Sequence, residues 1–308
     1  DAFRANHVAV KAEMDFVIEA GKIDSSFISN GTIWSAKSIP LTNENRDRLI
    51  EGTWACDGAA EYSYCGSPDA VIAKNRERLS KSGTPSGEVQ LGYMAKMECL
   101  FDGDMLAQHV IDDPFDPFRG AIAVWKHGND TLFVRGKGPY SWWECTFPYY
   151  LGYRFPKTVP RVVQLTRGTI PMDVEVYTTE LSKGWLRLEV AYDSTVGYVP
   201  RHTRLLSYDP NGKTTFVKEC YVLTVEHCKA GGFVPTEWYI ANFNIDEFAS
   251  RYPSYDESVN LAPSRSLVSV EHFRSTRFAD RTNPVALVHA GSANELVAQG
   301  GTVKFPKG

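Results

Sequence analysis

The histidines are the side chains of this sequence best suited to acid–base chemistry or metal binding. The seven are His7, His109, His127, His202, His227, His272 and His289. None lies three or four positions from another, the spacing that brings two metal ligands together on a helix. Glu226, His227 and Cys228 are adjacent, but in a strand His227 points away from the other two. The sequence therefore predicts no metal ligand.

Motifs for nucleophilic catalysis and phosphate binding are also missing from the sequence. Gly212-Lys213-Thr214 has the ending of a phosphate-binding loop, but that motif needs a glycine where Ser207 stands. The sequence contains no G-x-S-x-G, no H-E-x-x-H and no strand-associated G-x-G-x-x-G. We therefore predict a protein that is not an enzyme, with no catalytic residue and no cofactor. A hydrolase whose triad comes together only in space is an alternative.

The cysteines leave two interpretations open. Six are present and no two are spaced as C-x-x-C, so a zinc ribbon or a thioredoxin-like site is not expected. They are either buried small hydrophobic residues or partners in at least one disulfide. Cys56 and Cys65 flank a predicted hairpin and are the best local pair. Cys220 and Cys228 on one continuous strand would lie roughly 26 Å apart, far beyond disulfide reach.

Composition limits the class of protein and its partners. The 308 residues allow one large β domain or two ordinary ones, and the hydrophobic content of 43% is enough for a sizeable core. The formal net charge is −4 and the basic residues are scattered, which argues against a nucleic-acid partner. No apolar run approaches the roughly 20 residues that a membrane helix needs, so no transmembrane segment is expected.

Alternation of apolar and polar residues indicates a long N-terminal strand. From Val8 to Ile18 the even positions are apolar and the odd ones are largely charged, the period of a strand with one buried face. We expect Met14, Phe16 and Ile18 to be buried, and the acids between them to be exposed.

Turn signals place the elements that follow. Residues 42–50 are polar and predict a short exposed helix or a loop, and Asp57-Gly58 predicts a hairpin between residues 53–56 and 61–65. Ser67-Pro68-Asp69 is typical of a helix start, and that helix should end near Lys81. The aromatic-rich segment 138–155 is either part of the core or an exposed binding surface.

The C-terminal half predicts an antiparallel meander. Strands are expected at residues 173–179, 186–192, 203–208, 214–227 and 233–243, separated by tight turns such as Asp209-Pro210-Asn211-Gly212. Strands joined by tight turns must be antiparallel neighbours, because parallel pairing needs long crossovers.

One pattern in this meander carries a family resemblance. Leu186-Arg187-Leu188-Glu189-Val190 is followed by Asp193 and by Gly197-Tyr198-Val199-Pro200-Arg201. The turn 209–212, a long alternating strand, Gly231-Gly232 and Pro235 come next. This order resembles the LolA/LolB-like group of bacterial envelope proteins, which includes lipoprotein carriers and the sensory regulator RseB.

The resemblance implies a mainly β (α+β) fold: a curved, unclosed antiparallel sheet wrapped around a few helices, a LolA-like half-barrel. Residues 1–250 would form this domain, and residues 251–308 a C-terminal extension packed on it. The resemblance also implies a periplasmic or otherwise exported protein, with another envelope protein as a further partner.

The expected function is the binding of an apolar small molecule, a lipid or a lipoprotein acyl chain, in a cavity between sheet and helices. The predicted lining consists of eight residues: Met14, Phe16, Ile18, Leu186, Leu188, Val190, Trp238 and Ile240. A rival is a recognition or regulatory module whose cavity is filled by its own side chains and which binds a protein partner. The hydrolase named above is the third.

Overall fold

The structure is a computed structural model that describes residues 2–24, 41–42, 44–58, 60–82, 96–101, 105–112, 122–126, 138–139, 161–167, 170–181, 183–212, 214–243, 267–283, 285 and 302–303. The helices in these ranges are α1 (Ala2–Ala9), α3 (Asp69–Ser82) and the short 3-10 helix η2 (Ser194–Val196). The strands are β1 (Ala12–Asp24), β2 (Arg46–Cys56), β3 (Glu61–Gly66), β4 (Lys96–Phe101), β5 (Met105–Asp112), β6 (Ile122–Lys126), β7 (Arg161–Arg167), β8 (Ile170–Leu181), β9 (Gly184–Asp193), β10 (Val199–Tyr208), β11 (Thr214–His227), β12 (Phe233–Phe243), β13 (Leu267–Asp280) and β14 (Thr302–Val303).

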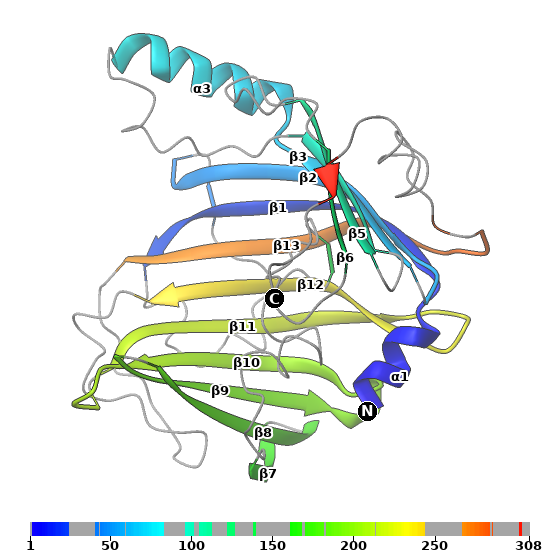
Figure 1. Cartoon of the computed structure of the whole chain (residues 1–308), viewed down its shortest axis with the longest axis vertical. Coiled ribbons are helices and arrows are strands. Elements are labelled where there is room, and N and C mark those ends of the chain that lie inside the picture. Colours follow the sequence, from blue (N-terminus) through cyan, green and yellow to red (C-terminus); the bar gives the residue numbers. More distant parts are fainter. Residues whose placement is uncertain are drawn as a thin grey trace.

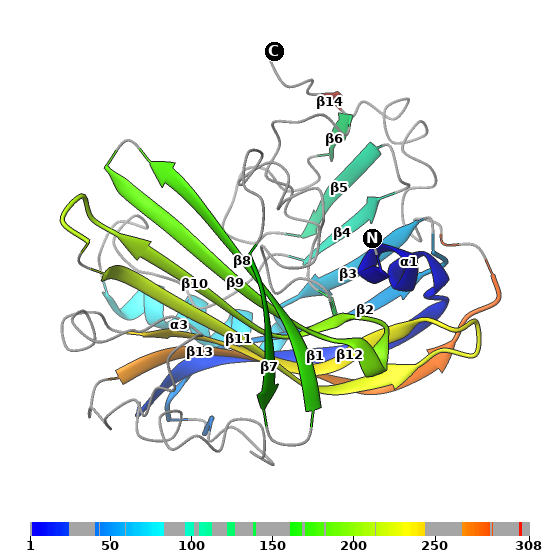
Figure 2. The same ribbon diagram turned by 90° about the horizontal axis from the view of Figure 1, so that it is seen from below.

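These strands form one curved sheet that does not close into a barrel (Figures 1 and 2). Its order is β14-β6-β5-β4-β3-β2-β1-β13-β12-β11-β10-β9-β8-β7. Neighbouring strands run antiparallel, except that the short β14 pairs with β6 in parallel. The predicted fold class, a mainly β protein with a curved, unclosed antiparallel sheet, is confirmed. Helix α1 lies at the ends of the strands beside β12, and α3 extends from the β3 corner (Figure 1).

Two meanders meet at the middle of the sheet. Strands β1 to β6 follow one another outward in one direction, and β7 to β12 follow one another inward from the opposite edge. Strand β13 lies between β1 and β12 and pairs with both, for example through Phe273 opposite Ile18 on one side and opposite Trp238 on the other. The segment expected to be a C-terminal extension thus contains the strand that joins the two halves.

The prediction of an N-terminal strand is confirmed for its buried face and is wrong about the residue at which the strand begins. Met14, Phe16 and Ile18 are buried, and the acids Glu13 and Asp15 between them are partly exposed. However, Val8 belongs to α1 and is 58% exposed, and the strand starts only at Ala12.

Contacts from distant turns explain why the first residues form a helix instead. Asn6 donates through Nδ2 to the carbonyl of Phe233 over 3.0 Å and accepts from its N–H over 2.8 Å. The backbone around Val8 and Val10 lies so close to Gly58 and Gly232 that a Cβ on either glycine would clash with it. Two glycine turns and the two hydrogen bonds of Asn6 therefore hold α1 against the end of the sheet. The alternation of apolar and polar residues does not indicate these long-range contacts.

Residues 46–50 begin strand β2, so the expected helix or loop in this segment is wrong. The polar side chains that prompted it have partners across the sheet. Arg46 forms an ion pair with Glu19 at 2.7 Å, and Arg48 with Glu271 at 2.8 Å. Because these cross-strand partners compensate the charges, a polar composition is compatible with a strand in the middle of the sheet.

The predicted hairpins are confirmed, as is the helix at α3. The turn after β2 holds four residues, Asp57 to Ala60, and places Cys56 opposite Glu61. Asp57 closes it by accepting from the N–H of Ala60 over 2.8 Å. The turn with Gly212 joins β10 to β11 as a hairpin, which agrees with the conclusion that it is no phosphate loop. Of the aromatic-rich segment 138–155, residues 140–155 lie outside the described residues.

Phe16 tests how much the centre of the core contributes to stability. Its side chain is 1% exposed and its ring centroid lies 5.1 Å from that of Phe273. Phe16→Ala is expected to lower the free energy of unfolding by about 3–5 kcal/mol, because it removes buried apolar surface and leaves a cavity. Urea denaturation measures this loss, with Val17→Ala on the opposite face as control. A loss no larger than that of the control would contradict the position of Phe16 in the core.

Candidate functional site

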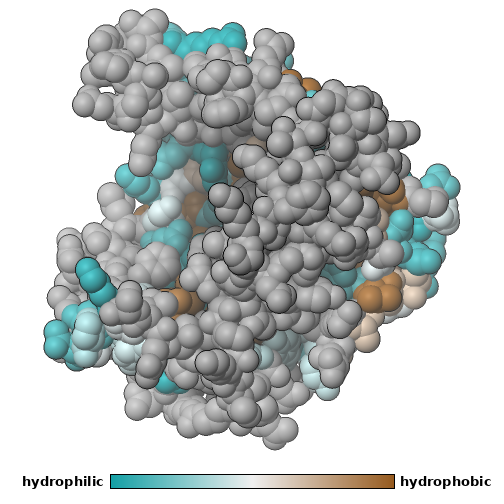
Figure 3. Space-filling model, viewed as in Figure 1, coloured by the Kyte–Doolittle hydropathy of each residue, from teal (hydrophilic) through white to brown (hydrophobic). Residues whose placement is uncertain are grey.

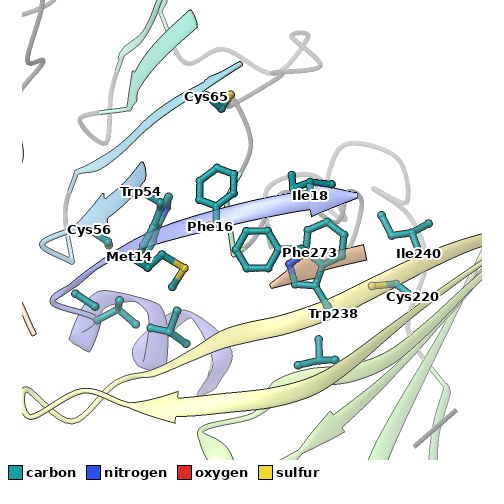
Figure 4. Close-up of a cluster of buried hydrophobic side chains, with 14 of the residues drawn as sticks. Met14, Phe16, Ile18, Trp54, Cys56, Cys65, Cys220, Trp238, Ile240 and Phe273 are labelled. Atoms are coloured by element: carbon teal, nitrogen blue, oxygen red, sulfur yellow. The ribbon is translucent and has the colours of Figure 1, made fainter. Parts of the chain in front are cut away.

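The residues predicted to line a binding site come together on one face of the sheet. Seven of them, all but Leu186, belong to one cluster of buried hydrophobic side chains, and Leu186 packs against it partly buried. Figure 4 shows part of this cluster, with Met14, Phe16, Ile18, Trp238 and Ile240 beside Phe273. We call the eight predicted residues together with Phe273 the apolar cluster.

Strand register explains how residues so far apart in sequence share this face. Ile18 of β1 lies opposite Phe273 of β13, which lies opposite Trp238 of β12. On the other half of the sheet, Leu188 of β9 lies opposite Leu205 of β10. The apolar cluster therefore extends continuously from the N-terminal meander into the C-terminal one.

Aromatic stacking organises the centre of the apolar cluster. The rings of Trp238 and Phe273 are nearly parallel, at an interplanar angle of 3° with centroids 5.1 Å apart. Trp238 is 0% exposed, yet its indole Nε1 has no hydrogen-bond acceptor among the described residues. An unsatisfied buried donor costs about 1–3 kcal/mol. By contrast, the indole of the buried Trp54 donates to Glu61 Oε1 over 2.9 Å.

The side chains of the apolar cluster are almost all buried in this structure. Its seven deeply buried predicted residues are between 0% and 5% exposed. A pocket of about 150 Å³ lies nearby, but of the predicted lining it touches only Met14. Its rim carries the paired charges of Arg277, which bonds Asp15 at 2.6 Å and Glu13 at 3.2 Å. The face in Figure 3 is hollowed at one side, and hydrophilic and hydrophobic residues are visible there together.

A buried polar network lies on the opposite face of the same strands, and sequence reasoning missed it. Its members alternate with residues of the apolar face. They are Glu189 of β9, His202 and Arg204 of β10, and Glu219 and Tyr221 of β11, each at most 5% exposed. A local search for short spacings between histidines does not detect it, because its members meet only across strands.

Arg204 is the centre of this polar network. Its guanidinium Nε donates to Glu219 Oε1 over 2.8 Å, and its Nη1 lies 3.6 Å from Glu189 Oε2. The Tyr221 hydroxyl also donates to Glu219, and the Tyr221 ring stacks on the His202 ring at 4.2 Å. Arg204 thus lies between two buried carboxylates, of which Glu189 also accepts from Arg187 Nε over 2.7 Å. Structural ion networks share this arrangement with charged binding sites.

A second polar group lies farther along this face. His272 Nε2 lies 3.0 Å from Glu237 Oε1, and the Thr224 hydroxyl donates to Glu237 Oε2 over 3.2 Å. The carboxylate therefore sits between hydroxyl and imidazole, whereas a hydrolytic triad needs the imidazole in the middle. The hydrogen bond from His272 holds the pKa of Glu237 below its ordinary value, assisted by Thr224 and opposed by partial burial.

The depressed pKa of Glu237 predicts a defined pH dependence of stability. Because the pKa is lower in the folded state than in the unfolded one, the contribution is complete above about pH 4.3 and is lost as the pH falls through the folded value. Glu237→Gln is expected to cost about 0.5–1 kcal/mol at neutral pH and almost nothing near pH 3. Urea titrations at both pH values measure this, with the exposed Glu226→Gln as control. An equal cost at both would contradict the His272 contact.

The described part of the chain contains no group of three or more His, Cys, Asp and Glu side chains that could hold a metal. Its five cysteines, at positions 56, 65, 99, 220 and 228, are buried and form no disulfide. Cys56 does not pair with Cys65, because it lies opposite Glu61. Burial raises the pKa of the Cys99 thiol well above its ordinary value, as expected of an unreactive core residue. Cys145 lies outside the described residues.

Comparison with known proteins adds no identity. No family model matches the chain, and no curated protein matches it. Among the described helices, none is long and apolar enough to cross a membrane. The apolar cluster and the polar network are therefore the two candidate sites, and both are argued from geometry alone.

Proposed function

We propose that this protein is a non-catalytic binding protein of the cell envelope that takes the acyl chain of a lipid or lipoprotein onto its apolar cluster. One observation carries the proposal: the residues predicted to bind the ligand lie together on one face of an unclosed, curved sheet. A sheet with open edges can separate from what covers it without breaking its own strand pairing. The LolA/LolB-like pattern in residues 186–235 supports both this type of ligand and an exported location.

Because these side chains are buried, a ligand reaches them only in an opened state of the protein. Exposing a buried side chain of the size of Leu188 or Ile240 costs about 1.5–3 kcal/mol. Burial of an acyl chain gains about 0.8 kcal/mol per methylene, so a dozen methylenes supply about 10 kcal/mol. This gain offsets the exposure of several side chains, and the ligand itself is therefore able to drive the opening.

Full burial of the cluster also supports a second function. If the interior stays filled by the protein's own side chains, the sheet is a rigid scaffold for recognition or regulation of a protein partner, such as another envelope protein. In that case the apolar cluster has a purely structural role, and the partner binds elsewhere on the surface.

Native mass spectrometry of the protein isolated from its own source separates the two functions. The acyl-binding proposal predicts an added mass that survives purification and is identified as a lipid after organic extraction. A bare polypeptide mass, together with no uptake of a fluorescent acyl ester, would contradict the acyl-binding proposal and support the recognition module.

A further inference from the structure

The indole N–H of Trp238, which has no hydrogen-bond acceptor in the described part of the chain, indicates a chemical property of the ligand. Its Nε1 is the unpaired donor at the centre of the apolar cluster, and the rest of the side chain is fully buried against Phe273. Buried polar groups are normally paired, so an orphaned donor at a candidate binding site indicates an acceptor that arrives with the ligand. A pure hydrocarbon has no such acceptor.

We propose that Trp238 donates its indole hydrogen to a carbonyl oxygen of the bound lipid, so that the ligand is a neutral acyl ester rather than a hydrocarbon or a free fatty acid. This inference rests on the proposed function. Among the described residues two tryptophans are buried, and they differ in this respect, since the Trp54 indole already donates to Glu61. Of these two, it is Trp238 that has an indole hydrogen to offer an incoming molecule.

The charges around the cluster favour an ester over a carboxylate. The strand neighbours of Trp238 are Phe273 and Val222, both uncharged. On the same face, Arg48 of β2 is already bonded to Glu271 over 2.8 Å. An ionised carboxylate beside Trp238 would be desolvated without a counter-ion, at large cost, whereas an ester carbonyl needs one donor only.

The unpaired indole donor of Trp238 is a property of the ligand-free structure. In the ligand-bound state the same donor gains the carbonyl oxygen of the ester as its acceptor. A ligand shifts a conformational equilibrium by its differential affinity for the two states. The missing hydrogen bond therefore favours the opened, ester-bound form over the ligand-free form.

The test compares two probes of equal carbon number, a pyrene-tagged alkane and a pyrene-tagged methyl ester. Wild-type protein is expected to bind the ester about tenfold more tightly, a difference of about 1.4 kcal/mol. In Trp238→Phe, which keeps a stacking ring and loses the donor, the ester-to-alkane ratio should fall to about one. In Trp54→Phe, whose donor serves Glu61, the ratio should remain near ten.

A measurement on the wild-type protein covers the case in which Trp238→Phe does not fold. With ¹⁵N-labelled tryptophan, the Nε1–H signal of Trp238 should move downfield when the methyl ester is added and stay in place with the alkane. Equal binding of both probes by wild type, or the same shift with both, would overturn the inference and leave the acyl-binding proposal standing. If neither probe bound, the proposed function itself would be overturned.

Discussion

Leu188→Glu is expected to unfold the protein or to lower its melting temperature steeply. Leu188 is 1% exposed and lies opposite Leu205 in the middle of the C-terminal meander. The substitution loses about 1.5–3 kcal/mol of apolar burial and adds a desolvation penalty of several kcal/mol for the carboxylate. A total of about 5 kcal/mol or more is comparable with the whole stability of many domains.

Thermal melting followed by circular dichroism measures this effect, and a titration with a fluorescent acyl ester follows binding in whatever fraction stays folded. Leu188→Met is the matched control, because a volume-conserving apolar exchange usually costs less than about 1.5 kcal/mol. An unchanged melting curve together with unchanged binding in Leu188→Glu would mean that this side chain faces solvent, and the apolar cluster would not be the ligand site.

Arg204→Met is the second substitution with a large expected effect, a loss of about 3–5 kcal/mol in the free energy of unfolding. Methionine keeps much of the volume but removes the guanidinium that bonds Glu219 at 2.8 Å, whereas Glu189 keeps its bond from Arg187 Nε over 2.7 Å. A buried carboxylate that loses its cationic partner is among the most expensive defects a core can hold. The loss should shrink when Glu219→Gln is added to Arg204→Met, since the carboxylate that lost its guanidinium partner is then replaced by a neutral amide.

Arg277→Met provides the control, because Arg277 also bridges two carboxylates but is 55% exposed. Solvent screens such exposed pairs, so the loss of stability in urea denaturation should be much smaller than for Arg204→Met. If the two arginine variants were equally stable, the polar network would be open to solvent rather than buried.

The sequence allowed prediction of what depends on neighbouring residues. Hairpins at Asp57-Gly58 and Asp209–Gly212 follow from turn chemistry, and the buried face of β1 follows from alternation. The predictions for two neighbouring segments were wrong, because contacts with residues far away in the sequence determine their secondary structure. Residues 2–9 are helical because Asn6 binds Phe233, and residues 46–50 are a strand because Glu19 and Glu271 compensate its arginines.

The same distinction between local pattern and long-range contact separates the two candidate sites. The apolar cluster was predictable because each strand presents its own apolar face, and register then aligns the faces. The polar network was not, because Glu189, Arg204 and Glu219 come from three strands, and no short spacing marks them as partners. The unpaired indole of Trp238 depends on the absence of an acceptor in three dimensions, which no sequence pattern displays.

The position of β13 has a consequence for how the chain is made. Synthesis proceeds from the N-terminus, so β1 is translated long before its partner β13, and β12 is also complete before it. During that interval both strands expose unpaired backbone edges, each with apolar side chains on one side. Joining the first strand to the last long one is a contact of very high sequence separation, which folds slowly. The nascent chain is therefore open to misassociation until residue 280 has emerged.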